Sequence, residues 1–284
     1  MIRNITFGSD PEYFIKNNKT GKIISSIPLI KGSKHNPESL GDGYYVLTDN
    51  ILAEGNIPPT ADPIQFMGNL LELKRRINRY LQEQYDFIEL YHDDCMEIDS
   101  VFLTHPDALL FGCSPYMNAW DKKEHRANDL SSENFRTAGE HIHIGYDLAP
   151  ENRHTKEYMN IIIARAFDIF VVIPSAMYHF DARRFFNYGG LGQYRDTSYG
   201  VECRSLGAFF GRDELLPWVI EQTCRALSFV KDEENIFALD RMDIPYVTQA
   251  KDGSVSVDVS IYEDLGLSFE NQLITKTVKI NADI

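Results

Sequence analysis

The chain has 284 residues, of which 43% are hydrophobic and 25% are charged, a balance typical of a folded globular protein rather than a disordered one. Its formal net charge of −14 argues against general nucleic-acid binding, because proteins of that class usually present a basic face. A local group of arginines or a bound cation could still attract an anionic ligand.

The sequence lacks the usual signals for secretion or membrane insertion. The stretch MIRNITFGSD has no long apolar segment of the kind found in signal peptides. The most apolar run, IIIARAFDIFVVI, has 13 residues and contains Arg165 and Asp168, so it is expected to be too short and too charged to span a bilayer. The four cysteines show no CxxC spacing, which favours free thiols in a reducing compartment. We therefore expect a cytoplasmic protein with no nucleic-acid or membrane partner.

The N-terminal 60 residues are expected to form short strands. Turn signals at 18–21 and 41–43 separate them and predict hairpins. A helix is expected next, because Asp62 suits an N-cap, Pro63 suits the first helical position, and apolar residues then recur at helical spacing to Leu81.

Strands and loops are expected over 86–147, followed by a helix capped by Thr155 that should end or kink at Pro174. A glycine-rich loop and a strand then precede a helix from Asp213 to about Val230. A final hairpin is expected around Asp252-Gly253.

Groups of strands with a few long helices between them predict an α+β fold with a mainly antiparallel sheet. Regular βαβ alternation and a Walker-type loop are absent from the sequence. Since no linker divides the chain, we expect a single catalytic domain over 1–284, with a motif-bearing core at about 5–210 and a C-terminal helix and hairpin at about 213–284.

Four strand-like segments carry polar side chains two residues apart, which places each pair on one face of a strand. The segments are GSDPEYF, LAEGNIP, GEHIHIG and YGVECRS, and the pairs are Asp10 and Glu12, Glu54 and Asn56, His141 and His143, and Glu202 and Arg204. On neighbouring strands they would form a floor of carboxylates, imidazoles and a guanidinium. Such a floor is costly to bury unless its charge is compensated, and Mg²⁺ is a natural partner of carboxylates.

Each pair also has a simpler interpretation. Asp10 could begin a turn, Glu54 could end a solvated loop, and the two histidines could lie on an exposed strand face. Glu202 and Arg204 could form a surface ion pair of little energetic value. The case for a site comes from the four pairs together.

Two further loops carry candidate anion-binding residues. The glycine-rich loop RRFFNYGGLGQYRDTSYG contains Arg195 directly before the Glu202 strand, and arginine forks suit phosphates and carboxylates. Arg183 and Arg184 in the same loop are interpreted as a solvated helix end. In IKGSKHNPE, Lys34 could contact phosphate or belong to an ordinary surface turn.

These motifs resemble those of a known enzyme family. GEHIHIG is similar to the Gly-x-x-His-x-His segment of glutamine synthetases, YGVECRS to their Ile-Glu-Phe-Arg strand, and SDPEYF to their early paired-carboxylate strand. In order, the motifs resemble the phage-type carboxylate–amine ligases, the amidoligase type 2 family of the glutamine-synthetase-like and glutamate-cysteine-ligase-like superfamily, over most of residues 5–210. The chain departs from the family pattern at KGSK, where Lys31 replaces the first glycine of the turn.

The resemblance implies an ATP-dependent ligase with a glutamine-synthetase-like fold, in which a curved antiparallel sheet surrounds the active site and helices pack outside it. The enzyme would act in the host cytoplasm if a phage encodes it. By position, Glu12, Glu54, His141 and Glu202 would hold two or more Mg²⁺ ions. His143 and Arg195 would contact the phosphates of ATP, with Lys34 a further candidate, and Arg204 would hold the acyl phosphate or the substrate carboxylate. Asp10 or Glu140 could accept the proton of the amine.

Other functions remain open at this point. A metal-dependent hydrolase would use the same histidines and glutamates to activate water. A phosphagen-kinase-like phosphotransferase and a binding module without chemistry are further alternatives. The substrates are expected to be a small-molecule or peptide carboxylate and an amine; their identities and the oligomeric state are not determined by the sequence.

Overall fold

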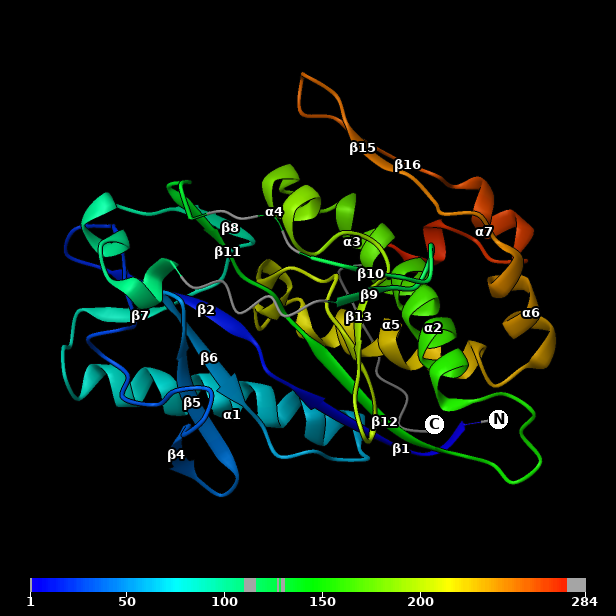
Figure 1. Cartoon of the computed structure of the whole chain (residues 1–284), viewed down its shortest axis with the longest axis horizontal. Helices are drawn as coiled ribbons and strands as arrows, with labels where there is room; N and C mark the ends of the chain where they lie inside the picture. Colours follow the sequence, from blue (N-terminus) through cyan, green and yellow to red (C-terminus); the bar gives the residue numbers. More distant parts are fainter. Residues whose placement is uncertain (1, 110–115, 127, 129–130, 275–284) are drawn as a thin grey trace.

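The computed structural model describes residues 2–109, 116–126, 128 and 131–274 (Figure 1). Two six-stranded sheets form its centre, and every described strand pair in them is antiparallel. The expected α+β class and antiparallel pairing are therefore confirmed. The expectation of one sheet is corrected, because the chain leaves the first sheet at Ser9 and starts the second at Glu12.

The first sheet has the order β1-β12-β14-β13-β9-β10. Its strands are β1 (Ile2–Ser9), β12 (Ile142–Leu148), β14 (Gly200–Cys203), β13 (Gln193–Asp196), β9 (Tyr116–Asn118) and β10 (Lys123–His125). Pairing places Gly8 opposite His143, His143 opposite Glu202, and Glu202 opposite Arg195. One row across four strands thus carries three of the predicted site residues.

The second sheet has the order β3-β2-β6-β5-β4, and β7 also pairs with β2. Its strands are β2 (Glu12–Asn17), β3 (Ile23–Ile24), β4 (Glu38–Gly41), β5 (Tyr44–Asp49), β6 (Leu52–Asn56) and β7 (Ile88–Tyr91). Both predicted hairpin turns are confirmed, since 18–21 joins β2 to β3 and 41–43 joins β4 to β5 with positive φ angles at all three positions. Glu12 lies directly opposite Glu54.

Helix α1 (Pro63–Gln82) covers one face of the second sheet (Figure 1). As predicted, Asp62 is its N-cap and accepts a hydrogen bond from the amide of Ile64. Its apolar stripe is buried against the strands, with Leu73 and Ile77 fully covered. The side chain of Leu73 closes directly over Gly55 of β6.

A helical stretch from Lys156 to Ala176 packs behind the first sheet. It consists of α2 (Lys156–Phe167), a π-turn over Asp168–Val172 and α3 (Ile173–Ala176). The prediction that the helix ends or kinks at Pro174 is wrong. The irregularity is instead a π-turn just before the proline, and the helix continues past Pro174 to Ala176. This stretch is long and apolar enough to cross a membrane, and 94% of its most apolar window is buried inside the molecule.

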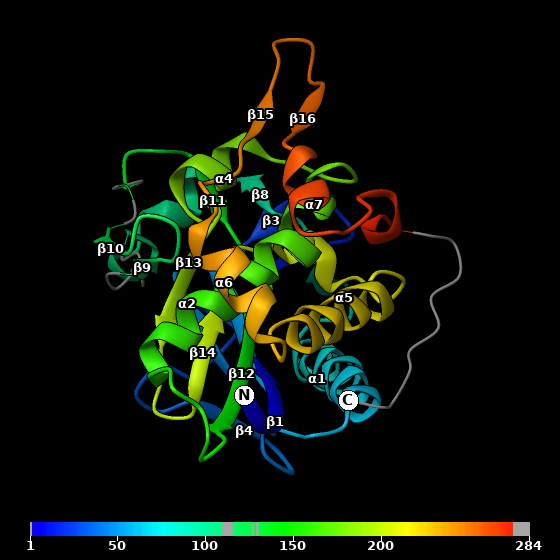
Figure 2. The ribbon, with the colours of Figure 1, turned by 90° about the vertical axis from the view of Figure 1, so that its right-hand side faces the viewer.

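The C-terminal part adds four more helices and a hairpin. These are α4 (Ala182–Asn187), α5 (Leu216–Phe229), α6 (Glu233–Arg241), β15 (Val247–Gln249), β16 (Val255–Val257) and α7 (Ser260–Asp264). Helix α5 starts three residues later than predicted, with a proline in its first turn. The predicted hairpin at Asp252-Gly253 is confirmed as β15–β16, which projects from the molecule in both views (Figures 1 and 2).

Smaller elements complete the described chain. Strands β8 (Cys95–Glu97) and β11 (Phe135–Thr137) form a two-stranded sheet. The 3-10 turns are Ser100–Leu103, Pro106–Leu109, Ala208–Gly211 and Glu270–Gln272. Cys95, Cys203 and Cys224 are buried and free, whereas Cys113 lies outside the described residues.

The first sheet has one apolar face and one polar face. In β12, Ile142, Ile144 and Tyr146 point into the hydrophobic core under α2 and α5, as do Val201 and Cys203 of β14. Because side chains alternate along a strand, the residues between them point to the opposite face. That opposite face carries the predicted polar residues.

Candidate active site

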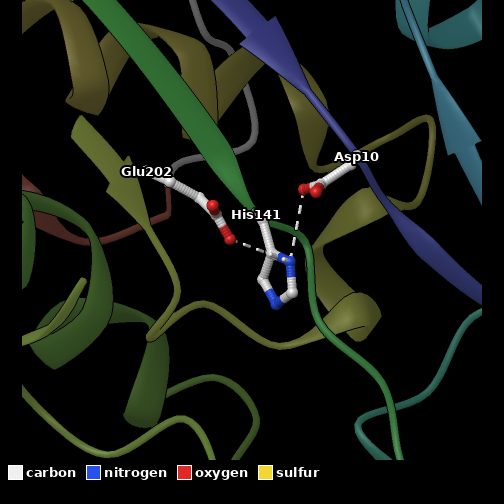
Figure 3. Close-up of side chains that lie close together, drawn as sticks. All are labelled: Asp10, His141 and Glu202. Carbon is white, nitrogen blue, oxygen red and sulfur yellow. Dashed lines mark ion pairs between the residues drawn. The ribbon is translucent and has the colours of Figure 1, made fainter. Parts of the chain in front are cut away.

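Asp10, His141 and Glu202 form the first of two polar clusters (Figure 3). Asp10 lies in the crossing between the sheets, His141 directly before β12, and Glu202 on β14. The Nδ1 atom of His141 is 3.2 Å from Oδ1 of Asp10 and 3.9 Å from Oε1 of Glu202. All three residues are thus close enough to share one cation.

Glu12, Asp49 and Glu54 form the second cluster, on three neighbouring strands of the second sheet. A ligand oxygen from each lies within 4.8 Å of the others. Asp49 was not predicted from the sequence. Its place in the cluster depends on the register of β5 against β6, in which Leu47 lies opposite Glu54 and Asp49 follows two residues later on the same face.

The second cluster places three carboxyl groups close together in a partly buried position, which disfavours their ionised forms. Burial raises the pKa of Glu54 well above its usual value, and the charges of Asp10, Asp49 and Glu12 raise it further. Burial also raises the pKa of Glu12, although His141 opposes this shift. A divalent cation would relieve this repulsion, and carboxylate oxygens are the ligands that Mg²⁺ prefers.

Two arginines approach Glu202 from the cavity side. Nη1 of Arg195 is 3.3 Å from Oε2 of Glu202, and Nε of Arg204 is 2.9 Å from Oε1. The second contact is an ion pair without hydrogen-bond alignment. Nη1 of the buried Arg204 has no hydrogen-bond partner among the described residues, and Nε has only its ion pair with Glu202. A buried guanidinium with free donors favours an anionic ligand.

His143 is held from both sides of its ring. Nε2 is 2.9 Å from Oδ1 of Asp10, and Nδ1 is 2.8 Å from the hydroxyl of Tyr199. Burial would lower the pKa of His143, but the charge of Asp10 and its hydrogen bond raise it overall. Burial would likewise raise the pKa of Asp10, but the charge of His143 and the contacts with both histidines lower it overall.

One cavity of about 950 Å³ joins these groups. The predicted site residues on its wall are Asp10, Glu12, Lys34, Glu54, His141, Arg195 and Arg204. Glu202 and His143 adjoin it through the contacts given above. The structure therefore brings these nine predicted residues together. Lys34 reaches the second cluster, where its Nζ lies 2.8 Å from Oδ2 of Asp49.

Glu140 does not belong to this cavity. It alternates with His141 and is fully buried, with neither carboxylate oxygen hydrogen-bonded within the described part of the chain. A Cβ atom added at Gly211 would lie 2.2 Å from its Oε2, which shows how tightly it is enclosed. Of the two proton acceptors considered for the amine, only Asp10 faces the site.

Two supporting residues were missed or misjudged in the sequence. The hydroxyl of Tyr188 lies 3.2 Å from Nε2 of His141, so it engages the nitrogen that faces away from the carboxylates. The interpretation of Arg184 as solvated is wrong. Arg184 is buried and donates hydrogen bonds to the carbonyls of Ala138, Arg204, Ser205 and Leu206, which fixes the chain on either side of the site.

Comparisons with known proteins provide no family for this chain. No protein-family model matches the sequence, and no curated protein shows significant similarity to it.

Proposed function

We propose that this protein is an ATP- and Mg²⁺-dependent ligase that joins a carboxylate to an amine through an acyl phosphate. The observation that carries the proposal is the content of one cavity: two clusters of potential cation ligands and the free donors of buried Arg204. Cations and a guanidinium around one space suit a substrate that is rich in phosphate and carboxylate groups.

The donor sets fit magnesium. Glu12, Asp49 and Glu54 would hold one ion through oxygen atoms, and Asp10, His141 and Glu202 would hold another. Bound Mg²⁺ would offset the charge of the phosphates and of the transferring phosphoryl group. Tyr188 supports this assignment because it leaves Nδ1 of His141 directed at the carboxylates.

The reaction follows from the chemistry of a carboxylate, which is a poor electrophile. A carboxylate oxygen would attack the γ-phosphorus of ATP, and ADP would leave. The amine nitrogen would then attack the acyl carbon, and phosphate would leave with the former carboxylate oxygen. Both steps need stabilisation of developing negative charge, which preorganised cationic donors supply.

Each cationic side chain would contact a different part of the substrates, according to its position in the cavity. Arg204 lies deepest and would hold the substrate carboxylate or its acyl phosphate. Arg195 and His143, which lie opposite Glu202 on the two strands that flank β14, would contact the phosphates of ATP. Lys34 would add a further phosphate contact from the edge of the second cluster.

The motif order supports the same proposal. GSDPEYF, EGNIPP, GEHIHIG and YGVECR resemble the amidoligase type 2 motifs, and the residues they supply meet in one cavity. A glutamine-synthetase-like fold and a single catalytic domain form part of this proposal.

The test is product formation by the purified chain. ATP, Mg²⁺ and pooled carboxylates are mixed with hydroxylamine, a small nucleophile that traps acyl phosphates as hydroxamates. ADP and hydroxamate should appear together, and only when a suitable carboxylate is present. Pooled amino acids or lysate in place of hydroxylamine should give a condensation product lighter than the sum of its parts by one water.

The same mixture without ATP is the control against hydrolysis. Amide or ester cleavage without ATP would instead identify a metal-dependent hydrolase. A stable phosphorylated product that does not react with hydroxylamine would identify a phosphotransferase.

A further inference from the structure

A second, smaller cavity lies beside the candidate active site. It has a volume of about 260 Å³ and is bounded by Thr6 and Gly8 of β1, His143 and Gly145 of β12, and Tyr199. Asn56, Ile57 and Pro59 line both this cavity and the large one, so a single segment after β6 separates the two spaces.

Small residues on the sheet create this space. Gly8 lies opposite His143, and Thr6 lies opposite Gly145, so two glycines occupy diagonal positions on the same face. A Cβ atom at Gly145 would lie 2.4 Å from Oγ1 of Thr6. At Gly8 a Cβ atom would meet only Cβ of His143, at 3.5 Å, and would otherwise project into open space.

The lining is mainly uncharged. Among the described residues that line this cavity, none is Asp, Glu, Lys or Arg, and His143 is the one that commonly carries charge. The rings of Tyr199 and His143 lie nearly parallel, 6.0 Å apart at 21°, on one side of it. Ile57 and Pro59 cover the side facing the large cavity. A compact body without strong charge suits such a lining.

The cavity adjoins the reacting centre at His143. The imidazole forms part of the cavity wall, and Nε2 contacts Asp10 of the first cluster. His143 therefore lies between this cavity and the first cluster, beside which the proposed acyl phosphate would form. The large cavity, at about 950 Å³, is the one with room for a nucleotide together with a carboxylate.

We propose that this smaller cavity holds the amine substrate and selects a primary amine with a compact, mainly apolar body. The inference rests on the proposed ligase function. The amine nitrogen forms the new C–N bond as the C–O bond to phosphate breaks, phosphate leaves, and Asp10 takes up the proton that the amine nitrogen loses.

Two variants narrow the cavity from different positions, Gly8→Ala and Thr6→Leu. Hydroxamate formation with hydroxylamine is compared with amide formation with butylamine, at the same ATP and carboxylate concentrations. Both variants should raise KM for butylamine about tenfold more than KM for hydroxylamine, because the added atoms occupy the space that the butyl chain needs. Gly68→Ala is the matched control. It lies on α1, where the nearest atom to an added Cβ is 3.8 Å away, and should leave both KM values unchanged.

Binding gives a second readout without ATP. Ligand-observed NMR should detect butylamine on the wild-type chain in Mg²⁺ and show weaker binding to Gly8→Ala and Thr6→Leu. An unchanged ratio of the two KM values in both variants would overturn the assignment while leaving the ligase intact. A rise in KM for ATP in place of KM for butylamine would also overturn it, and would place part of the nucleotide here. Failure to form hydroxamate with any carboxylate would overturn the ligase itself.

Discussion

The carboxylate of Glu202 lies between the rest of the first cluster, which includes the carboxylate of Asp10, and two arginines. It lies beside His141 in the first cluster and between Arg195 and Arg204 on the cavity side. Replacing Glu202 with glutamine would affect folding as well as activity, because Arg204 is buried and would lose its nearest counter-charge.

Glu202→Gln should therefore reduce ATP turnover by at least about a hundredfold and also lower the free energy of unfolding by roughly 1–3 kcal/mol. Turnover is measured as ADP release, and stability by urea unfolding. Glu72→Gln is the matched control, since Glu72 pairs with Arg75 and Arg76 on the outer face of α1 and should have little effect on either. Full turnover in Glu202→Gln would remove this residue from the site.

Glu140 predicts a pH effect on stability. Burial raises its pKa to about 8, whereas an unfolded glutamate titrates near 4.5. Between these values the folded chain holds a proton that the unfolded chain has released, so this group makes stability fall as pH rises through that range. Glu140→Gln should remove this pH-dependent loss of stability and raise Tm at pH 8 relative to wild type. The expected rise is roughly 2–4 °C for each kcal/mol gained in the free energy of unfolding.

The comparison is made by thermal unfolding at several pH values. The Tm advantage of Glu140→Gln should shrink as pH falls toward 4.5, where both chains carry a neutral side chain. An advantage of equal size at every pH would mean that packing, and not ionisation, sets the difference.

The contact between β6 and α1 can be tested by substituting two glycines, with opposite expected effects. A Cβ atom at Gly55 would lie 2.6 Å from Cδ2 of Leu73 and 3.0 Å from Cδ1 of Ile77, both in the core. Gly55→Ala should destabilise the fold by about 1–3 kcal/mol. Because Glu54 is adjacent, it should also weaken the metal dependence of turnover.

Gly68→Ala serves as the reference for this pair, since Gly68 lies within α1 with open space around it. It should raise the free energy of unfolding by about 0.5–1 kcal/mol through helix propensity. Urea unfolding of both variants is the measurement. Equal effects of the two substitutions would contradict close packing of α1 over β6.

At the scale of elements, local sequence signals located much of the structure. Asp62 and Pro63 marked the start of α1, and Gly253 marked the last hairpin. The π-turn before Pro174 could not be read from the sequence, because it depends on how the helix packs in the core. Arg184 was misjudged for a similar reason: its partners are backbone carbonyls, which leave no trace in residue identity.

The two clusters of potential metal ligands involve both sheets, so binding of Mg²⁺ should stabilise the whole fold. Mg²⁺ should raise Tm, by an amount that grows with ligand concentration as binding to the folded state requires. Glu54→Gln should reduce this shift, whereas Glu83→Gln at the exposed end of α1 should preserve it. Because the pKa of Glu54 is raised, protons compete with the metal, and the shift should increase with pH.

Differential scanning fluorimetry with Mg²⁺ at several pH values tests this expectation. A shift of the same size in Glu54→Gln would place the metal elsewhere.

The assembly of the site was predictable only in part at this scale. The i, i+2 pattern identified Glu54, His141, His143 and Glu202, because alternation needs no knowledge of the partner strand. The division between two sheets was hidden, because Asp10 and Glu12 read as one strand, whereas Asp10 lies in the crossing and Glu12 begins the second sheet. Asp49 depends on the register of β5 against β6, which long-range packing determines.

That crossing is only two residues long, Asp10 and Pro11, and it is secured on both sides. The amide of Gly55 donates to the carbonyl of Pro11, and the amide of Glu12 donates to the carbonyl of Gly139. The fixed φ angle of the proline and the hydrogen bonds at its own carbonyl and at the next amide leave little freedom for the sheets to move apart. The spacing between the two polar clusters is therefore set when the chain folds, and the proposed nucleotide would enter a cavity that needs no widening.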